Sequence, residues 1–455
     1  MKKKLSYIIL QLAFLSMPIT LRSQMISQRI DTPVWKKNTI VREWNSAYAI
    51  SYYEGNGKNW LTLIDYAGNI TPYNLDNGYY VNDIRILNDV AYLAGFYVAG
   101  AYEHDKDMPI TGAETCVIMR IDLTLLTSGA SSLNADYYKY NQGIYNKLAV
   151  FDNSGRVHIV AIGEDAAYSI VFEGDYFTSN TIVGKSINLP ISERLKEVII
   201  SDSYVALVGY SSGVSGVPYG YTIRRGDKHN LLNDSFTHDV FCYSEGDTYY
   251  AYVTATVLKE DNIAVASAPL FLTASGGQDG ETRLSTIDLN TMQITNEQRI
   301  WWEDKELPIE MVYYPNSDTL VLLQLSCYPV YYNHSGPTIF NNYSFITFLP
   351  SMTSNYSMEE VYVPDTVFTS IDKLYGRYFF AGGGRSWFFK DGTVQPSQDT
   401  SPWLCYEYYK KDVEIITPVD FVKGNIPYAI PMPSLTPPQQ FPLTLDILSV
   451  YNYCR

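Results

Sequence analysis

The chain has few charged residues, and most of its charges are negative. Charged side chains make up 18% of the 455 residues, with 48 acidic residues against 33 basic ones. A protein of this sign repels nucleic-acid phosphates and anionic lipid surfaces. We therefore expect no nucleic-acid partner, and we interpret the excess of acid as a contribution to solubility.

Cysteine is also scarce. The five cysteines show no Cys-x-x-Cys pair and no Cys/His spacing typical of zinc sites, and they are Cys116, Cys242, Cys327, Cys405 and Cys454. An odd number leaves at least one thiol without a partner in its own chain. Two alternatives remain open: a Cys405–Cys454 disulfide that pins the C-terminal tail, and buried free cysteines that pack as small hydrophobic residues.

Sequence motifs for catalysis and metal binding are missing. There is no Gly-x-Ser-x-Gly nucleophile motif, and the five histidines are scattered along the chain. Residues 103–107, Glu-His-Asp-Lys-Asp, form the densest run of potential calcium ligands, but they lack the glycine and the spacing of a calcium loop. We predict no catalytic residue, no metal and no cofactor.

Long apolar runs are absent after the N-terminus. Residues 2–4 are lysines and residues 5–17 are mostly apolar, which is typical of a secretory signal peptide. The run is shorter than the about 20 apolar residues that a membrane-spanning helix needs. We predict that residues 1–23 are a cleaved signal peptide and that no integral membrane segment remains. The protein would be exported, with a periplasmic, cell-surface-associated or secreted location.

Tyrosine is the residue present in excess, with 41 copies. Aromatic and β-branched side chains favour the pleated, half-buried surfaces of β-sheets. Convincing amphipathic helices of ten or more residues are absent. The composition therefore predicts an all-β protein.

One pattern recurs along the chain. Residues 81–87 form a candidate strand, Asn88-Asp89 a turn, residues 90–95 an apolar strand that ends in glycine, and residues 117–123 a third strand after a loop. Such self-similarity indicates a repeat architecture. The second strand of each repeat is apolar almost throughout, as expected for a strand buried on both faces. These features predict a β-propeller.

Seven repeats can be placed within residues 39–412, which favours seven four-stranded blades. Six or eight blades, or two stacked β-domains, are the alternatives. The pattern resembles the repeats of secreted bacterial β-propeller proteins over most of residues 39–410, without the signatures of WD40 repeats, kelch repeats or sialidases. This resemblance implies a fold and leaves the function open, because propellers carry unrelated activities.

Two terminal segments lie outside the repeats. Residues 24–38 form an N-terminal segment that could close the ring. Residues 413–455 form a proline-rich tail, which cannot supply a central strand because proline lacks a backbone donor. We expect the tail to pack on the propeller or to help close it.

Five carboxylates near the starts of repeats could face a central funnel, and they are Asp83, Glu197, Asp239, Glu310 and Asp372. A pair of carboxylates at the right separation can act as acid and base, or as acid and nucleophile, in glycoside hydrolysis. The alternative interpretation is that these are solvated side chains at strand ends.

Aromatic pairs are the strongest indication of a binding surface. Adjacent residues of a strand point to opposite faces, so one member of a pair can be buried while the other is exposed. Exposed tyrosine and tryptophan suit sugars and protein interfaces. We select Trp301, Trp302, Tyr331 and Tyr332 as candidate ligand-binding residues.

The sequence thus favours an exported, non-enzymatic β-propeller that binds a protein or a glycan through loops on one face. The alternative is a secreted hydrolase or lyase that acts on polysaccharides with carboxylates in the funnel. The sequence leaves open whether the chain is an enzyme and which ligand it binds.

Overall fold

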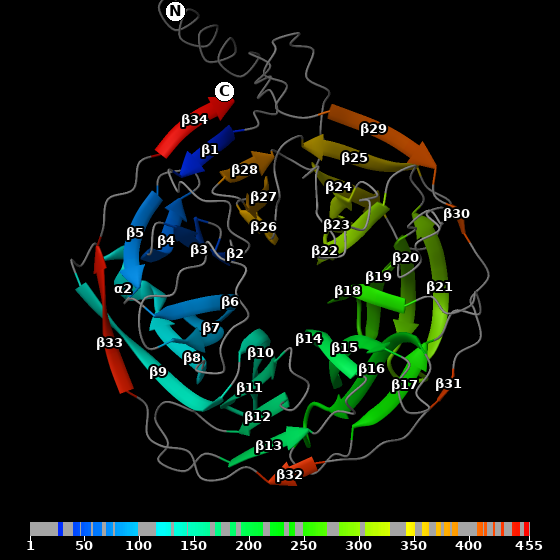
Figure 1. Cartoon of the computed structure of the whole chain (residues 1–455), viewed down its shortest axis with the longest axis horizontal. Coiled ribbons are helices and arrows are strands. Elements are labelled where there is room, and N and C mark those ends of the chain that lie inside the picture. Colours follow the sequence, from blue (N-terminus) through cyan, green and yellow to red (C-terminus); the bar gives the residue numbers. More distant parts are fainter. Residues whose placement is uncertain are drawn as a thin grey trace, which may run out of the picture.

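The computed structural model is a ring of antiparallel sheets around a central axis, which is the architecture of a β-propeller (Figure 1). The structure describes residues 26–30, 40–45, 47–55, 58–65, 70–75, 78–98, 115–128, 132–142, 144–163, 169–173, 183–187, 193–212, 219–231, 236–241, 249–270, 282–300, 305–327, 343–350, 357–363, 370–374, 377–382, 385–389, 407–412, 414–415, 422–423, 429–431, 439–445 and 450–454.

Consecutive strands follow one another from the axis outward (Figure 1). The innermost strands are β2 (Ile40–Asn45), β6 (Tyr79–Leu87), β10 (Tyr145–Asn153), β14 (Glu193–Ile200), β18 (Tyr249–Val257), β22 (Lys305–Tyr314) and β26 (Ser370–Leu374). The second strands are β3 (Tyr48–Gly55), β7 (Val90–Tyr97), β11 (Arg156–Gly163), β15 (Tyr204–Ser212), β19 (Asn262–Leu270), β23 (Thr319–Cys327) and β27 (Arg377–Gly382).

The third strands are β4 (Lys58–Asp65), β8 (Thr115–Asp122), β12 (Ser169–Glu173), β16 (Tyr219–Asp227), β20 (Thr282–Asp288), β24 (Tyr343–Pro350) and β28 (Arg385–Phe389). The fourth strands are β5 (Ile70–Leu75), β9 (Ser132–Gln142), β13 (Val183–Ile187), β17 (Thr237–Phe241), β21 (Gln293–Ile300) and β25 (Ser357–Val363). One short helix, α2 (Leu123–Thr127), follows β8.

The last set of strands is completed from the other end of the chain. β1 (Ile26–Ile30) pairs with β28, so the N-terminal segment supplies the fourth strand of the sheet that begins at β26. β29 (Glu407–Asp412), which follows the seventh repeat in the sequence, pairs with β25 of the preceding sheet. The sheet at which the ring closes therefore contains strands from both ends of the chain.

The C-terminal tail adds a further strand to the outside of each sheet (Figure 1). After β29 come β30 (Glu414–Ile415), β31 (Val422–Lys423), β32 (Ala429–Pro431), β33 (Gln439–Leu445) and β34 (Val450–Cys454). They pair in turn with β21, β17, β13, β9 and β5 together, and β1. The tail therefore circles the ring in the direction opposite to the repeats. β33 joins two sets of four strands into one nine-stranded sheet.

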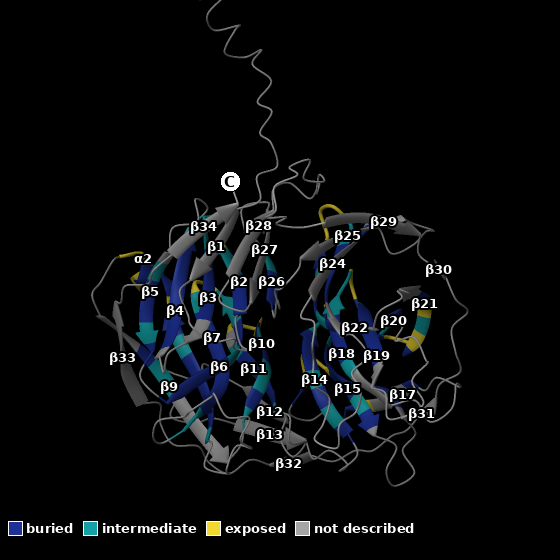
Figure 2. Ribbon diagram, turned by 45° about the horizontal axis from the view of Figure 1, so that its top comes forward, coloured by how far each residue is buried: buried dark blue, intermediate teal, exposed yellow. Residues whose placement is uncertain are grey.

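Hydrophobic cores lie between neighbouring sheets. One of them joins Ala94 and Ile118 of the β6–β9 set to Leu148 and Ala161 of the next sheet. Second strands are buried on both faces, as expected from their apolar sequences: residues 91–94 and 159–162 are each at most 5% exposed. Figure 2 shows this burial along the inner and middle strands. Short turns connect first to second strands, and Asn88 and Asp89 have φ angles of 49° and 60°, the positive values of a type I′ hairpin turn.

A β-bulge recurs on the innermost strands, and it explains the glycine that ends several second strands. The pairing of β6 with β7 shifts register between Val81 and Asp83, and β10, β14, β18 and β22 have similar shifts. Gly95 lies opposite Val81, and a Cβ atom there would overlap the carbonyl oxygen of Tyr80. Gly209 lies in the same place beside β14.

We predict that Gly95→Ala lowers the free energy of unfolding by at least about 3 kcal/mol, because a backbone oxygen cannot move aside as a side chain can. The control is Gly155→Ala, where a Cβ atom would have no neighbour within 4 Å and only the positive φ of 80° is strained. That strain costs about 1 kcal/mol. Urea unfolding of both variants measures the difference, and equal losses would contradict the role of the bulge.

Candidate functional site

Charged side chains follow most of the bulges and point toward the axis. The residues immediately after the register shifts on β6, β10, β14 and β22 are Asp83, Lys147, Glu197 and Glu310. A bulge inserts one residue into a strand and re-aims the side chains beside it. The local irregularity therefore brings charged groups of the innermost strands to the centre.

Arg42 on β2 lies at the middle of this cluster, which we call the axial cluster (Arg42, Asp83, Arg85, Lys147, Glu197, Glu310 and Asp372). Its Nη2 atom lies 2.8 Å from Asp83 Oδ1 and 2.7 Å from Glu310 Oε1. Its other nitrogens donate to Ser370 Oγ at 2.9 Å and to the carbonyl of Ile84 at 3.0 Å. One guanidinium thus connects β2 with β6, β22 and β26, although only 8% of its side chain is exposed.

Three carboxylates of the axial cluster also accept hydrogen bonds from the backbone of the next innermost strand. The amide of Leu148 on β10 donates to Asp83 Oδ2 at 3.1 Å, and that of Ile371 on β26 donates to Glu310 Oε2 at 2.7 Å. Asp372 Oδ2 accepts from an amide of β2 at 2.8 Å. Each of these carboxylates therefore joins its own sheet to the following one.

Glu197 and Arg85 each use only some of their polar atoms in hydrogen bonds and ion pairs. Glu197 Oε1 lies 3.2 Å from Lys147 Nζ and accepts from the Thr254 hydroxyl at 3.3 Å. Arg85 Nε donates to the carbonyl of Leu148 at 3.0 Å and lies 3.2 Å from Asp83 Oδ2. Among the described residues, neither Glu197 Oε2 nor the two terminal nitrogens of Arg85 have a hydrogen-bonding partner.

The pKa values of the carboxylates diverge. Burial alone would raise the pKa of both Asp83 and Glu310, but nearby cations outweigh it, Arg85 first for Asp83 and Arg42 for Glu310. Both pKa values therefore lie below their usual range. Burial raises the pKa of Glu197, and Lys147 opposes that shift only in part. For Arg42, burial would lower the pKa, yet Glu310 and Asp83 raise it well above the ordinary value.

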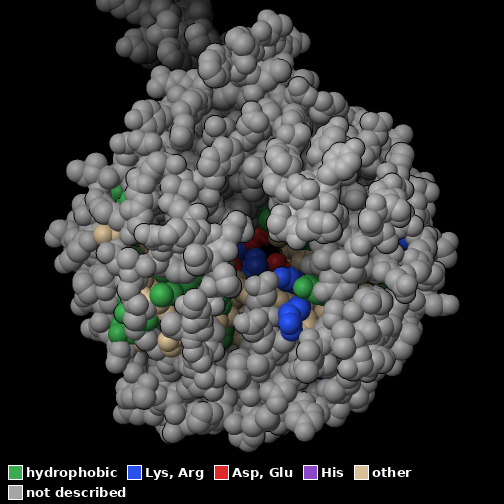
Figure 3. Space-filling view, in the orientation of Figure 1, with side chains coloured by type: hydrophobic (Ala, Val, Ile, Leu, Met, Phe, Trp, Pro, Cys, Tyr) green, Lys and Arg blue, Asp and Glu red, His purple; other side chains and the backbone are tan. Residues whose placement is uncertain are grey.

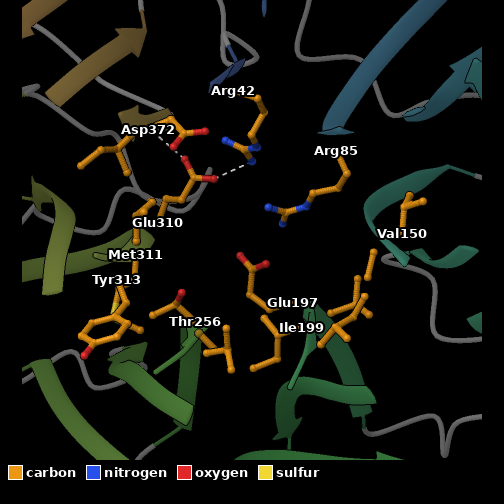
Figure 4. Close-up of a pocket in the computed structure, with 17 residues that line it drawn as sticks. Arg42, Arg85, Val150, Glu197, Ile199, Thr256, Glu310, Met311, Tyr313 and Asp372 are labelled. Atoms are coloured by element: carbon orange, nitrogen blue, oxygen red, sulfur yellow. Dashed lines mark hydrogen bonds and ion pairs between the residues drawn. The ribbon is translucent and has the colours of Figure 1, made fainter. Parts of the chain in front are cut away.

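A cavity of about 280 Å³ lies against the axial cluster (Figure 4). Its charged lining consists of Arg42, Arg85, Glu197, Glu310 and Asp372. The remaining wall is largely apolar and includes the half-buried aliphatic side chains Val150, Ile200, Val257 and Val312 together with Tyr313. Figure 3 shows acidic and basic side chains at the bottom of a hollow in the centre of the ring.

Four of the five carboxylates selected from the sequence meet at this centre, and they are Asp83, Glu197, Glu310 and Asp372. The fifth, Asp239, is a correction. It lies on β17, the fourth strand of its sheet, where it is 3% exposed and far out from the innermost strand. A strand-end position along the sequence does not reveal how far from the axis the strand lies.

Most of the other residues selected from the sequence lie outside the described part of the chain. The candidate ligand-binding residues Trp301, Trp302, Tyr331 and Tyr332 lie outside the described residues, as do residues 103–107. Cys405 is also outside them, so the Cys405–Cys454 pairing stays a prediction. Cys116 is a buried free thiol on β8, and burial raises its pKa to about 12.

Sequence reasoning missed the basic residues of the axial cluster, Arg42, Arg85 and Lys147. Their signal is a basic residue on an innermost strand, close to an acidic residue of a neighbouring repeat. Within the described part of the chain, no group of three His, Cys, Asp or Glu side chains is arranged to hold a metal ion. The described residues also include no helix of the length and apolarity that would cross a bilayer.

Comparisons with known proteins identify no family. No family model matches the chain, and no curated protein matches its sequence. A solved structure with similar architecture is "Drosophila Plexin A in complex with Semaphorin 1b", with 6% sequence identity and a TM-score of 0.40 over 81% of this chain and 87% of that one. The propeller assignment rests on the sheet topology described above.

We predict that Arg42→Gln lowers the free energy of unfolding by about 3–5 kcal/mol, because it leaves two buried carboxylates without their shared cation. The matched control is Lys259→Gln. It removes the exposed ion pair that Lys259 forms with Asp318 at 3.2 Å, and it should leave stability unchanged. Chemical unfolding of both variants tests this. An Arg42→Gln protein as stable as the control would show that the axial cluster does not hold the ring together.

The lowered pKa of Glu310 predicts a pH dependence. Its ionised form is favoured in the folded state, so its contribution to stability is complete above the usual glutamate value of 4.5 and is lost as pH falls through the lower folded-state pKa. Glu310→Gln should therefore cost about 3–5 kcal/mol at pH 7. The difference from wild type should shrink as pH falls below 4.5. Unfolding free energies measured across this range check it, and a constant difference would rule the explanation out.

Proposed function

We propose that this protein is an exported, non-catalytic β-propeller of seven blades that binds a protein or a glycan through the connections on one face. The observation that carries the proposal is the state of the axial carboxylates. Asp83 and Glu310 are fully engaged by Arg42 and by backbone amides of the next strand. Carboxylates committed in this way join the sheets and are not available as an acid and base pair.

The strand topology supports the count of seven. The nine-stranded sheet contains two complete antiparallel sets, β2–β5 and β6–β9, and only the tail strand β33 joins them. Treating each set as a blade gives seven units with the other five sheets. Each unit then has its own innermost strand at the axis (Figure 1).

The connections that we expect to bind leave the ring on the same face. In an antiparallel set, the connection from second to third strand and the connection to the next sheet both lie at the end where the innermost strand begins. Tyr331 and Tyr332 fall between the second and third strands β23 and β24. Trp301 and Trp302 fall between β21 and β22, the connection from one sheet to the next. Loops carried on a rigid scaffold are the usual place for recognition.

The experiment is a binding screen of the chain from residue 24 against a glycan array and a panel of extracellular and envelope proteins. We expect a saturable ligand whose affinity falls at least about tenfold, or 1.4 kcal/mol, when Trp301 and Trp302, or Tyr331 and Tyr332, are replaced by alanine. The control replaces Lys259 and Glu260, which are exposed in a turn between first and second strands and therefore lie on the opposite face.

A polysaccharide-active hydrolase is the alternative, and one observation favours it. The cavity combines Glu197, whose pKa is raised, with Glu310, whose pKa is lowered. Two carboxyl groups with separated pKa values are the pattern of an acid and its ionised partner. If the same screen finds no ligand and instead detects release of reducing sugar that Glu197→Gln abolishes, the binding proposal is wrong and the hydrolase is right.

A further inference from the structure

The axial cavity has features of a small-molecule site that the proposed binding face does not require. Most of its wall is apolar, and two charged side chains reach into it with atoms that the fold leaves unused. Ligand sites typically combine apolar walls with a few placed polar groups, in volumes from about 300 Å³ upward. At about 280 Å³, this cavity suits a single small molecule and not a polymer.

Glu197 is the first of these side chains. It is 4% exposed, and its Oε2 atom has no hydrogen-bond donor among the described residues, while Oε1 is held by Lys147 and Thr254. Glu197 lines the cavity, so a ligand or water there can supply a donor to this oxygen. Figure 4 shows this carboxylate pointing into the cavity.

Arg85 is the second. Its Nε atom is anchored to the Leu148 carbonyl and Asp83, which fixes the plane of the guanidinium. The two terminal nitrogens have no acceptor among the described residues, and 32% of the side chain is exposed. The guanidinium and the Glu197 carboxylate face each other (Figure 4), and the positive charge of Arg85 lowers the pKa of Glu197 against the effect of burial. A guanidinium with two free donors fits a carboxylate in the bidentate geometry.

The remaining lining selects for the rest of the ligand. Val150, Ile200, Val257 and Val312 come from four successive sheets and present half-buried aliphatic surface to the cavity. Arg42 and Glu310 are saturated by each other and by their other partners, so they offer no free charge. A ligand that carried only a negative or only a positive group would leave either Glu197 Oε2 or the terminal nitrogens of Arg85 without a partner.

We infer that the axial cavity binds a small α-amino acid zwitterion with an aliphatic side chain. Its carboxylate is held by the terminal nitrogens of Arg85, its ammonium by Glu197 Oε2, and its side chain by the aliphatic wall. Such a ligand has no net charge and bonds at once to Glu197 Oε2 and to the terminal nitrogens of Arg85. A residue at either end of a peptide lacks one of the two charged groups, so the cavity distinguishes the free amino acid from a peptide terminus.

The test is isothermal titration of the folded chain from residue 24 with three probes of similar shape. They are leucine, 4-methylpentanoate, which lacks the ammonium, and leucinamide, which lacks the carboxylate. We expect leucine to bind saturably and each analogue to bind at least about tenfold more weakly, because each loses a hydrogen-bonded charge. Absence of saturable leucine binding at millimolar concentrations, or equal binding of the three probes, would overturn the inference.

Variants assign the two ends of the ligand. Arg85→Gln should abolish the preference for leucine over leucinamide but keep the preference over 4-methylpentanoate, and Glu197→Gln should do the reverse. The control is Arg120→Gln, which removes the 2.9 Å ion pair between Arg120 and Asp136, away from the cavity. This variant should bind all three probes as wild type does. Loss of both preferences in every variant would show a structural effect and overturn the assignment. The wild-type probe series remains decisive if a variant does not fold.

Discussion

The bonds between innermost strands across the axis are the constraint on which the ring depends. Apolar burial between sheets supplies most of the attraction, but it is non-directional and tolerates sliding of one sheet against the next. A carboxylate that accepts from a particular backbone amide, as Asp83 does from Leu148, sets the height of one strand against its neighbour. A buried ion pair stabilises only when all its partners are in place, so the axial cluster favours one relative position of the sheets over others.

Where the two ends of the chain meet, bonds close the ring at the axis, in the middle of the sheet and at its outer edge. At the centre, Arg42 and the backbone of β2 bond to Ser370 and Asp372 of β26. Farther out, β1 completes the sheet that begins with β26, and β34 then covers β1. The tail strands between β29 and β34 occupy the outer edges of the remaining sheets. Except for β33, which lies between β5 and β9, each tail strand is itself the outermost strand of its sheet.

The parts of the fold that depend on local pattern could be predicted. The apolar second strands and the Asn88-Asp89 turn follow from residue type and periodicity, and four carboxylates of the centre were found from their positions near strand starts. The bulges were not predicted, although Gly95 and Gly209 are their trace in the sequence. The tail strands could not be predicted, because β30 and β31 have two residues each and their pairing is defined by partners more than a hundred residues away.

The repeats share a topology but carry different charges on their innermost strands. This difference determines where the axial cluster has polar atoms available to a ligand. On the side of β22, β26, β2 and β6, Arg42 and the backbone amides consume every carboxylate oxygen of Asp83 and Glu310. At β18 the residue after the bulge is Tyr252, which brings no charge, and Thr254 provides the bond to Glu197. The network of bonds is therefore complete around part of the axis and unfinished beside β14. We infer a small-molecule site there because Glu197 and Arg85 use only some of their polar atoms to join neighbouring strands.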